Sequence, residues 1–176
     1  MKNDTNFESI LMDQLLRHEG YRRFPYKCTS GRETIGIGRN ISDKGISKSE
    51  ALHLLRNDIN ECHIDLSKLF LNSFNQMPLN AQLVLLDLRF NLGARGFRSF
   101  KNMIRNVEHG NWEGAAAEMI KSRWFNQTGT RAITLVNMMR SIKSTPEQYT
   151  ECLTDKLREQ DIDAGLMTAA GERHYD

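Results

Sequence analysis

The order of apolar and polar positions in the first forty residues predicts one helix followed by a small sheet. Thr5–Glu8 has the form of a capping box, and Gly20 is suited to end the helix that it begins. Four apolar positions between them keep helical spacing: Phe7, Ile10, Leu11 and Leu15. Residues 21–40 lose this period, and the turn-forming pair Ser30–Gly31 precedes Thr34–Gly38. We therefore expect short strands joined by a tight turn.

The rest of the chain has a helical period. A second capping box at Ser47–Glu50 begins a long helix at about 47–69. Its apolar stripe contains Ala51, Leu54, Leu55, Ile59, Cys62 and Leu66. Pro78 is suited to the first turn of another helix. Further helices are expected at about 98–107, 112–121, 130–141 and 146–158.

This order of elements predicts an α+β fold that is mainly α. Residues 1–160 are expected to form a single domain, with a small β lobe at about 21–46 and a connecting helix at about 47–69. A helical lobe at about 70–158 would include the N-terminal helix. A cleft between the two lobes is the expected substrate site. The polar segment 161–176 is expected to be a C-terminal tail.

Composition and charge exclude several classes of function. The 176 residues are 39% hydrophobic, and no apolar run approaches the roughly 18 residues that span a bilayer. The net charge is only +2, and basic and acidic residues are interleaved, which does not favour nucleic acid binding. The three cysteines, Cys28, Cys62 and Cys152, lack the spacing of a metal site. We expect a monomer without a metal or other cofactor.

Glu19 is the first candidate for a catalytic residue. It lies four positions after Leu15, on the apolar stripe of its helix and in the last turn. Partial burial and the helix macrodipole would both raise the pKa of its carboxyl group. A carboxyl group that stays protonated near neutral pH can protonate a glycosidic oxygen. On spacing alone, an ordinary surface glutamate near a helix end is an equal alternative.

Two distant motifs resemble one known family. Glu19, Cys28 and Thr34 have the spacing of a glutamate, eight residues, an aspartate or sometimes a cysteine, five residues and a threonine. Far downstream, Ser122–Thr128 is followed by Arg131, which resembles a second signature. Over roughly residues 8 to 150, the chain thus resembles the lysozymes of the T-even phages and their endolysin relatives, the muramidases of glycoside hydrolase family 24.

The resemblance implies a lysozyme-like fold and a role for each matching residue. Glu19 would donate a proton to the leaving oxygen. Thr34 would help to hold the attacking water on the opposite face of the sugar, so that the anomeric carbon is inverted. Arg131 would hold Glu19 in place. The substrate-binding residues implied by the resemblance are Gly36, Gly38, Phe90 and Asn91.

Cys28 stands where most members of the family have aspartate. A thiol is mostly neutral at pH 7 unless its pKa is lowered, and Lys27 or Arg32 could lower it. Some relatives, including secreted endolysins, carry cysteine here. Two alternatives to a catalytic Cys28 remain. Cys28 could be a small apolar residue on a hairpin, or Glu33 could supply the base, although strand alternation points Glu33 to the other side of the strand from Thr34. Oxidation of a catalytic thiol at Cys28 would also block the water site.

The function that we expect from this resemblance is that of an endolysin. It would hydrolyse the β-1,4 bond between N-acetylmuramic acid and N-acetylglucosamine in bacterial peptidoglycan and cause lysis of the host cell. The alternative is a catalytically weak peptidoglycan-binding protein that keeps the lysozyme fold. The first residues do not resemble a signal peptide, so we expect the protein to stay in the host cytoplasm until it is released to the cell wall.

Overall fold

The computed structural model describes residues 4–71 and 73–143. These residues are mainly helical, with a three-stranded antiparallel sheet near the N-terminus, so the predicted fold class is confirmed. The chain divides into two compact units, Met1–Asn57 and Asp58–Asp176. The predicted helix at 146–158 and the tail at 161–176 lie outside the described residues. No helix in the described part of the chain is long and apolar enough to cross a membrane.

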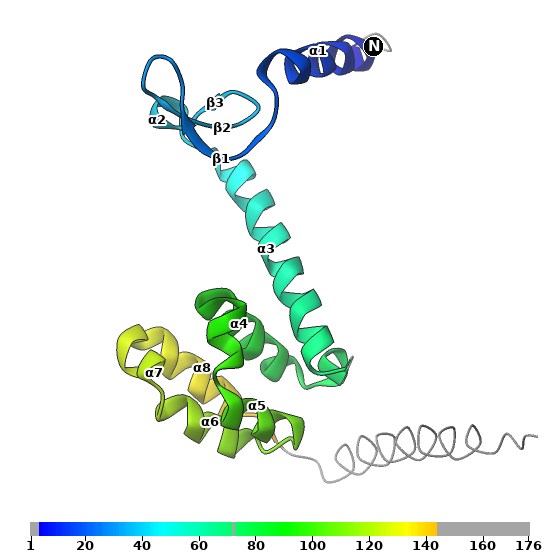
Figure 1. Ribbon diagram of the computed structural model, residues 1–176. Coiled ribbons are helices and arrows are strands. Elements are labelled where there is room, and N and C mark those ends of the chain that lie inside the picture. The colour runs from blue at the N-terminus through cyan, green and yellow to red at the C-terminus, as the bar shows by residue number, and fades with distance from the viewer. Residues whose placement is uncertain (1–3, 72, 144–176) are drawn as a thin grey trace, which may run out of the picture. The chain divides into compact units, whose positions relative to one another are not determined.

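The first unit contains a helix, the sheet and the start of a long helix (Figure 1). Its elements are α1 (Asp4–Glu19), β1 (Arg22–Lys27), β2 (Glu33–Gly36), β3 (Arg39–Asn40), α2 (Ile41–Lys44) and the first residues of α3 (Lys48–Leu69). Helix α1 ends before Gly20, as predicted. Helix α1 already includes Asp4, so it begins before the predicted cap at Thr5. Capping patterns locate helix ends only to within one or two residues.

The sheet has the strand order β1-β2-β3. Thr34 of β2 pairs with Tyr26 of β1 and with Asn40 of β3. The pairing of β1 with β2 is irregular between Arg22 and Tyr26, the segment that contains Pro25. Proline has no amide hydrogen to donate to a neighbouring strand, which confines it to edge strands and bulges. The register is regular where β1 meets the turn to β2.

Arg39 joins the sheet to the start of α3. Its Nε and Nη2 donate hydrogen bonds of 3.2 and 3.0 Å to the carbonyl oxygen of Gly45, and Nη2 donates to Glu50 Oε2 at 3.2 Å. Glu50 also completes the capping box: its Oε2 accepts from the Ser47 amide at 2.7 Å, and its own amide donates to Ser47 Oγ at 3.2 Å. The predicted capping box at Ser47 is therefore confirmed. Hydrogen bonds from Ser47 and the charge of Arg39 lower the pKa of Glu50.

The second unit contains the remainder of α3 and a group of shorter helices (Figure 1). They are η1 (Ser73–Gln76), α4 (Leu79–Arg98), α5 (Lys101–Glu108), α6 (Trp112–Ile120), α7 (Arg123–Thr128) and α8 (Thr130–Arg140). The helices predicted at 112–121 and 130–141 are confirmed to within one residue at each end. The helix predicted at 98–107 begins later, at Lys101, because α4 continues to Arg98. Helices α2 and α7 are too short to show a helical period, and the sequence did not predict them.

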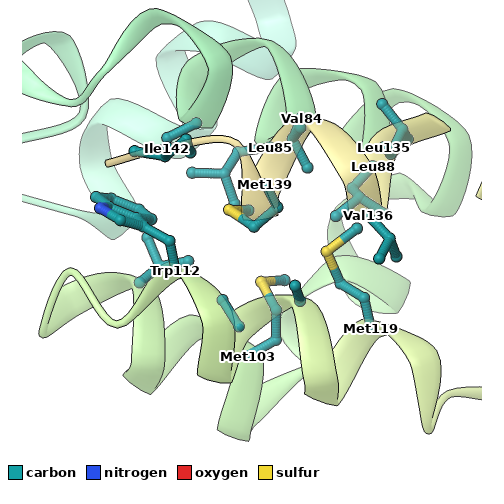
Figure 2. Close-up of a cluster of buried hydrophobic side chains, with 14 of the residues drawn as sticks. Val84, Leu85, Leu88, Met103, Trp112, Met119, Leu135, Val136, Met139 and Ile142 are labelled. Atoms are coloured by element: carbon teal, nitrogen blue, oxygen red, sulfur yellow. The ribbon is translucent and has the colours of Figure 1, made fainter. Parts of the chain in front are cut away.

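The core of the second unit lies between α4, α5, α6 and α8 (Figure 2). Its largest fully buried side chains are Phe74, Phe97, Leu66, Leu85, Leu88, Met103, Met119, Met139 and Val84. On α3, the predicted apolar stripe is buried only at Cys62 and Leu66, whereas Leu54, Leu55 and Ile59 are exposed. The stripe has helical spacing over its whole length, but only its C-terminal part packs into a core.

A buried ionic cluster ties α3 to α4. Arg89 is only 7% exposed, and its Nε donates to Asp65 Oδ2 at 2.6 Å. Its Nη2 donates to Glu61 Oε1 at 3.2 Å, and Arg98 also pairs with Asp65. Although burial by itself raises the pKa of Asp65, the hydrogen bonds from Arg89 and Arg98 outweigh it and lower that pKa. The buried cation is thus compensated by carboxylates from α3.

Replacing the buried arginine should destabilise the protein much more than replacing an exposed one. We expect Arg89→Met to lower the free energy of unfolding by about 2–4 kcal/mol, because the half-buried carboxylate of Asp65 loses a partner. The matched control is Arg140→Met, which breaks the exposed pair with Glu113 and should cost less than about 1 kcal/mol. Urea denaturation followed by circular dichroism measures both. Equal losses for the two variants would contradict this account.

Candidate active site

Residues 29–31 form a turn between Cys28 and Arg32, which follow β1 and precede β2. This three-residue turn positions the first group of candidate residues. The amide of Cys28 donates to the carbonyl oxygen of Arg32 at 2.9 Å, and the amide of Gly31 donates to the carbonyl oxygen of Cys28 at 2.8 Å. Gly31 has a φ of +77°, a conformation that glycine adopts without strain. A loop of this length closes a hairpin when its third residue is left-handed. The side chains of Cys28 and Ser30 are thereby held at one end of the sheet.

The thiol of Cys28 contacts one hydroxyl group of this turn. Its Sγ lies 3.0 Å from Ser30 Oγ, and the side chain of Thr34, on β2, also acts on its pKa. Hydrogen bonds from the side chain and backbone of Ser30 lower the pKa of the thiol to about 7, against a smaller opposing effect of burial. Cys28 lies on the turn that leads into β2, the strand that carries Thr34, and their catalytic roles stay predictions.

The cations that the sequence suggested are not the main cause of this shift. Arg32 forms an ion pair with Asp43 of α2, and its backbone, not its guanidinium group, is among the leading influences on the thiol. Lys27 pairs across the strands with Glu33. The low pKa of Cys28 therefore comes from neutral donors, which corrects the expectation that Lys27 or Arg32 would supply it.

Thr34 and Glu33 lie on opposite sides of β2, as strand alternation predicted. The side chain of Thr34 is buried, with an exposed fraction of 4%, and its Oγ1 donates to the carbonyl oxygen of Arg32 at 3.3 Å. Glu33 is exposed. The Glu33 carboxylate is therefore not placed to replace Cys28 beside Thr34.

The carboxyl group of Glu19 lies against the turn between β2 and β3. It packs on Gly38 so closely that a Cβ atom there would be 2.8 Å from Glu19 Oε2 and 3.0 Å from its Cδ. Gly38 also has a φ of +68°, so both the space and the backbone favour glycine. At Gly36, by contrast, a Cβ would meet open space. Gly38 therefore holds a catalytic candidate in place, which the sequence did not predict.

Glu19 is not buried within the first unit. The apolar stripe of α1 is exposed there as well, at Phe7, Ile10, Leu11 and Leu15. The segment does form a helix, but the small sheet covers none of its apolar stripe. The first unit thus does not supply the burial that was expected to raise the pKa of Glu19.

The second unit gathers further candidates on one face of α4. Asp87 and Asn91 are one helical turn apart, and each binds a residue of a later helix. Asp87 Oδ1 accepts from Arg131 Nε at 2.7 Å, and Asn91 Oδ1 accepts from Trp124 Nε1 at 2.8 Å. Phe90, between them in sequence, is 44% exposed. The helix has non-helical backbone angles at Gly93, two residues after Asn91.

The predicted role of Arg131 as the partner of Glu19 stays a prediction, since the partner found within the second unit is Asp87. Sequence reasoning missed Asp87, Trp124 and Ser30. Asp87 and Arg131 are 44 residues apart, and no local sequence pattern links them. The position of Ser30, two residues after Cys28 in a turn, was a signal that could have been used.

The two described cysteines should differ strongly in reactivity. At pH 7 we expect iodoacetamide to modify Cys28 at least about tenfold faster than Cys62, because thiolates are the reactive form. Cys28 is partly exposed with a lowered pKa, whereas burial raises the pKa of Cys62, which is 4% exposed. A time course of labelling, followed by mass spectrometry of the peptides, gives the two rates. Similar rates would contradict the environment described for Cys28.

Several known proteins are similar in sequence to this chain over most of its length. Residues 16–144 match the phage lysozyme family. A probable T4-type lysozyme 2 of Dictyostelium discoideum is 26% identical over 162 residues, which cover 76% of this chain and 95% of that protein. An endolysin of Acyrthosiphon pisum secondary endosymbiont phage 1 is 32% identical over 111 residues, covering 60% of this chain and 71% of the endolysin. The pre-baseplate central spike protein Gp5 of Enterobacteria phage T4 is 25% identical over 171 residues, 80% of this chain but 30% of Gp5. The chain belongs to the phage lysozyme family, a family of glycoside hydrolases.

Proposed function

We propose that the protein is a muramidase that cleaves the β-1,4 bond between N-acetylmuramic acid and N-acetylglucosamine in bacterial peptidoglycan. One observation carries this proposal. The Glu19 carboxyl group packs on Gly38 at the turn that follows β2, and the turn that precedes β2 carries Cys28, with Thr34 near the start of the same strand. The family to which the chain belongs, and the endolysin and lysozymes that it resembles, support the same substrate.

Each of the three residues has a chemical role in this reaction. Glu19 donates its proton to the glycosidic oxygen as the bond to the anomeric carbon breaks. A water molecule attacks that carbon from the opposite face, and the configuration is inverted. Thr34 orients the water with its hydroxyl group. Cys28, about half ionised at pH 7 with a pKa of about 7, accepts the proton that the water loses.

Residues of the second unit bind the glycan in this proposal. The exposed ring of Phe90 offers an apolar surface to a sugar, and Asn91 offers its amide nitrogen while Trp124 holds its oxygen. In the first unit, Gly36 leaves room for a sugar beside the β2 backbone, since a Cβ there would meet open space. These contacts contribute binding and leave the proton transfers to the first unit.

A second candidate function is a peptidoglycan-binding protein with little activity. The cysteine at position 28 is the observation that favours it, because a neutral thiol is a weaker proton acceptor than a carboxylate. The two functions differ in whether new reducing ends appear, and not in whether the protein binds the wall.

Glu19→Gln should abolish hydrolysis and leave wall binding intact. We expect the release of reducing ends from purified peptidoglycan to fall by at least about a hundredfold, since the amide cannot protonate the leaving oxygen. Co-sedimentation with the same peptidoglycan measures binding. Hydrolysis that persists in Glu19→Gln would exclude this mechanism, whereas binding without any hydrolysis by the unchanged protein would favour the second candidate.

Gly38→Ala should remove activity through steric displacement of Glu19. The new Cβ would lie 2.8 Å from Glu19 Oε2, so the carboxyl group must move. A misplaced catalytic group costs about tenfold to a hundredfold in rate. Gly45→Ala is the matched control: Gly45 also has a positive φ, of +57°, but a Cβ there would meet open space.

Both alanine variants place a Cβ at a positive φ, where an L side chain is strained. Thermal unfolding should therefore show a loss of stability for both, while the reducing-end assay shows a loss of activity for Gly38→Ala alone. Equal activity in the two variants would show that the contact between Gly38 and Glu19 does not matter for the reaction.

A further inference from the structure

Ser30 makes contacts that the hairpin itself does not require. The turn is closed by two backbone hydrogen bonds, from Gly31 to Cys28 and from Cys28 to Arg32. The hydroxyl of Ser30 takes no part in either, yet it lies 3.0 Å from Cys28 Sγ. The Ser30 hydroxyl thus contacts the sulfur rather than the backbone of the turn.

From this geometry we propose that Ser30 is a positioning residue, whose hydroxyl fixes the Cys28 sulfur and stabilises its thiolate form as a proton acceptor. The proposal rests on the proposed function, because it assumes that Cys28 accepts a proton during hydrolysis. Ser30 itself does not touch the substrate in this account. It acts through Cys28 alone.

Hydrogen-bond donors stabilise a thiolate more than a neutral thiol, because the anion is the stronger acceptor. The side chain of Ser30 makes the largest contribution to the lowered pKa of Cys28, followed by the Ser30 backbone. Burial opposes them, and smaller contributions come from the Arg32 backbone and the Thr34 side chain. The thiol is thus made acidic by the shape of the turn.

Charged groups are present around the turn, and their effects are smaller. On the hairpin they are Lys27, Glu33 and Arg32, and α2, which packs on β2, adds Asp43 and Lys44. Arg32 is paired with Asp43, and Lys27 lies opposite Glu33. These opposite charges largely offset each other at the exposed end of a sheet.

The proton balance of the reaction then depends on Ser30. As the oxygen of water bonds to the anomeric carbon, its proton passes to the Cys28 thiolate, and the proton of Glu19 passes to the leaving oxygen. After product release, the thiol returns its proton to solvent and Glu19 takes one up. Activity should therefore rise with pH as Cys28 ionises, and a change in the thiol pKa should move this rise.

The experiment compares Ser30→Ala with Ser30→Thr and with Thr29→Ala in the full-length protein. Thr29 is the neighbouring hydroxyl residue of the same exposed turn. The rate of iodoacetamide labelling of Cys28, measured from pH 5.5 to 9.5 by peptide mass spectrometry, gives the apparent thiol pKa (about 8.5 for an ordinary cysteine). We expect Ser30→Ala to raise this pKa and to slow labelling at pH 7 by about three- to tenfold. Ser30→Thr and Thr29→Ala should behave as the unchanged protein does.

The reducing-end assay supplies the second readout. In Ser30→Ala, kcat at pH 7 should fall by about the same factor as labelling, with KM unchanged, and the rise of activity should move to higher pH. In a Cys28→Asp background, Ser30→Ala should not move the pH profile, because no thiol remains.

The proposal and the function on which it rests fail in different ways. A thiol pKa that is equal in Ser30→Ala and the unchanged protein overturns the role of Ser30, whatever the activity. A pH profile that moves equally in the Cys28→Asp background also overturns it. Persistent hydrolysis by Glu19→Gln overturns the proposed function instead, even if the thiol titration shifts as expected.

Discussion

The three-residue turn between β1 and β2 is the constraint on which the candidate site of the first unit depends. Its backbone hydrogen bonds set the register that places Thr34 opposite Tyr26 and Glu33 opposite Lys27. A slip of one residue would exchange the two faces of β2, exposing Thr34 and burying Glu33. The same turn holds the sulfur of Cys28 near the Ser30 hydroxyl group. Strand pairing and thiol chemistry are therefore fixed by a single local geometry.

Polar side chains also hold the larger elements together in both units. Arg39 ties the last strand to the start of α3 by binding the Gly45 carbonyl and Glu50, while Arg89 ties α3 to α4 through Asp65. Arginine suits both places because its planar group donates several hydrogen bonds at fixed angles. This gives a structural reason for arginine at position 39, for which the sequence offered none. The small sheet buries few apolar side chains, so such hydrogen bonds matter more there than in the helical core.

The sequence predicted those features that depend on neighbouring residues. The capping box at Ser47, the end of α1 at Gly20 and the opposite orientations of Thr34 and Glu33 are local and were all correct. Pairs such as Arg131 with Asp87 depend on how distant helices pack, which no local pattern encodes. The burial expected for Glu19 is not supplied within the first unit for a related reason: an apolar stripe shows which face of a helix can be buried, but not what covers it.

In the proposed mechanism, a cysteine at position 28 in place of an aspartate changes what the surrounding turn must provide. A carboxylate is ionised at neutral pH without help, whereas an ordinary thiol, with a pKa of about 8.5, is not. Nearby cations could supply the difference, but paired cations on an exposed hairpin are screened by solvent and salt. The hydrogen bond to Ser30 at 3.0 Å is not screened by salt in this way, so a serine two residues along offers a compensation that does not depend on a nearby cation. The thiolate that results is also the form that oxidants attack. A residue that makes Cys28 a proton acceptor therefore makes it sensitive to oxidation as well, and an aspartate would have only the first property.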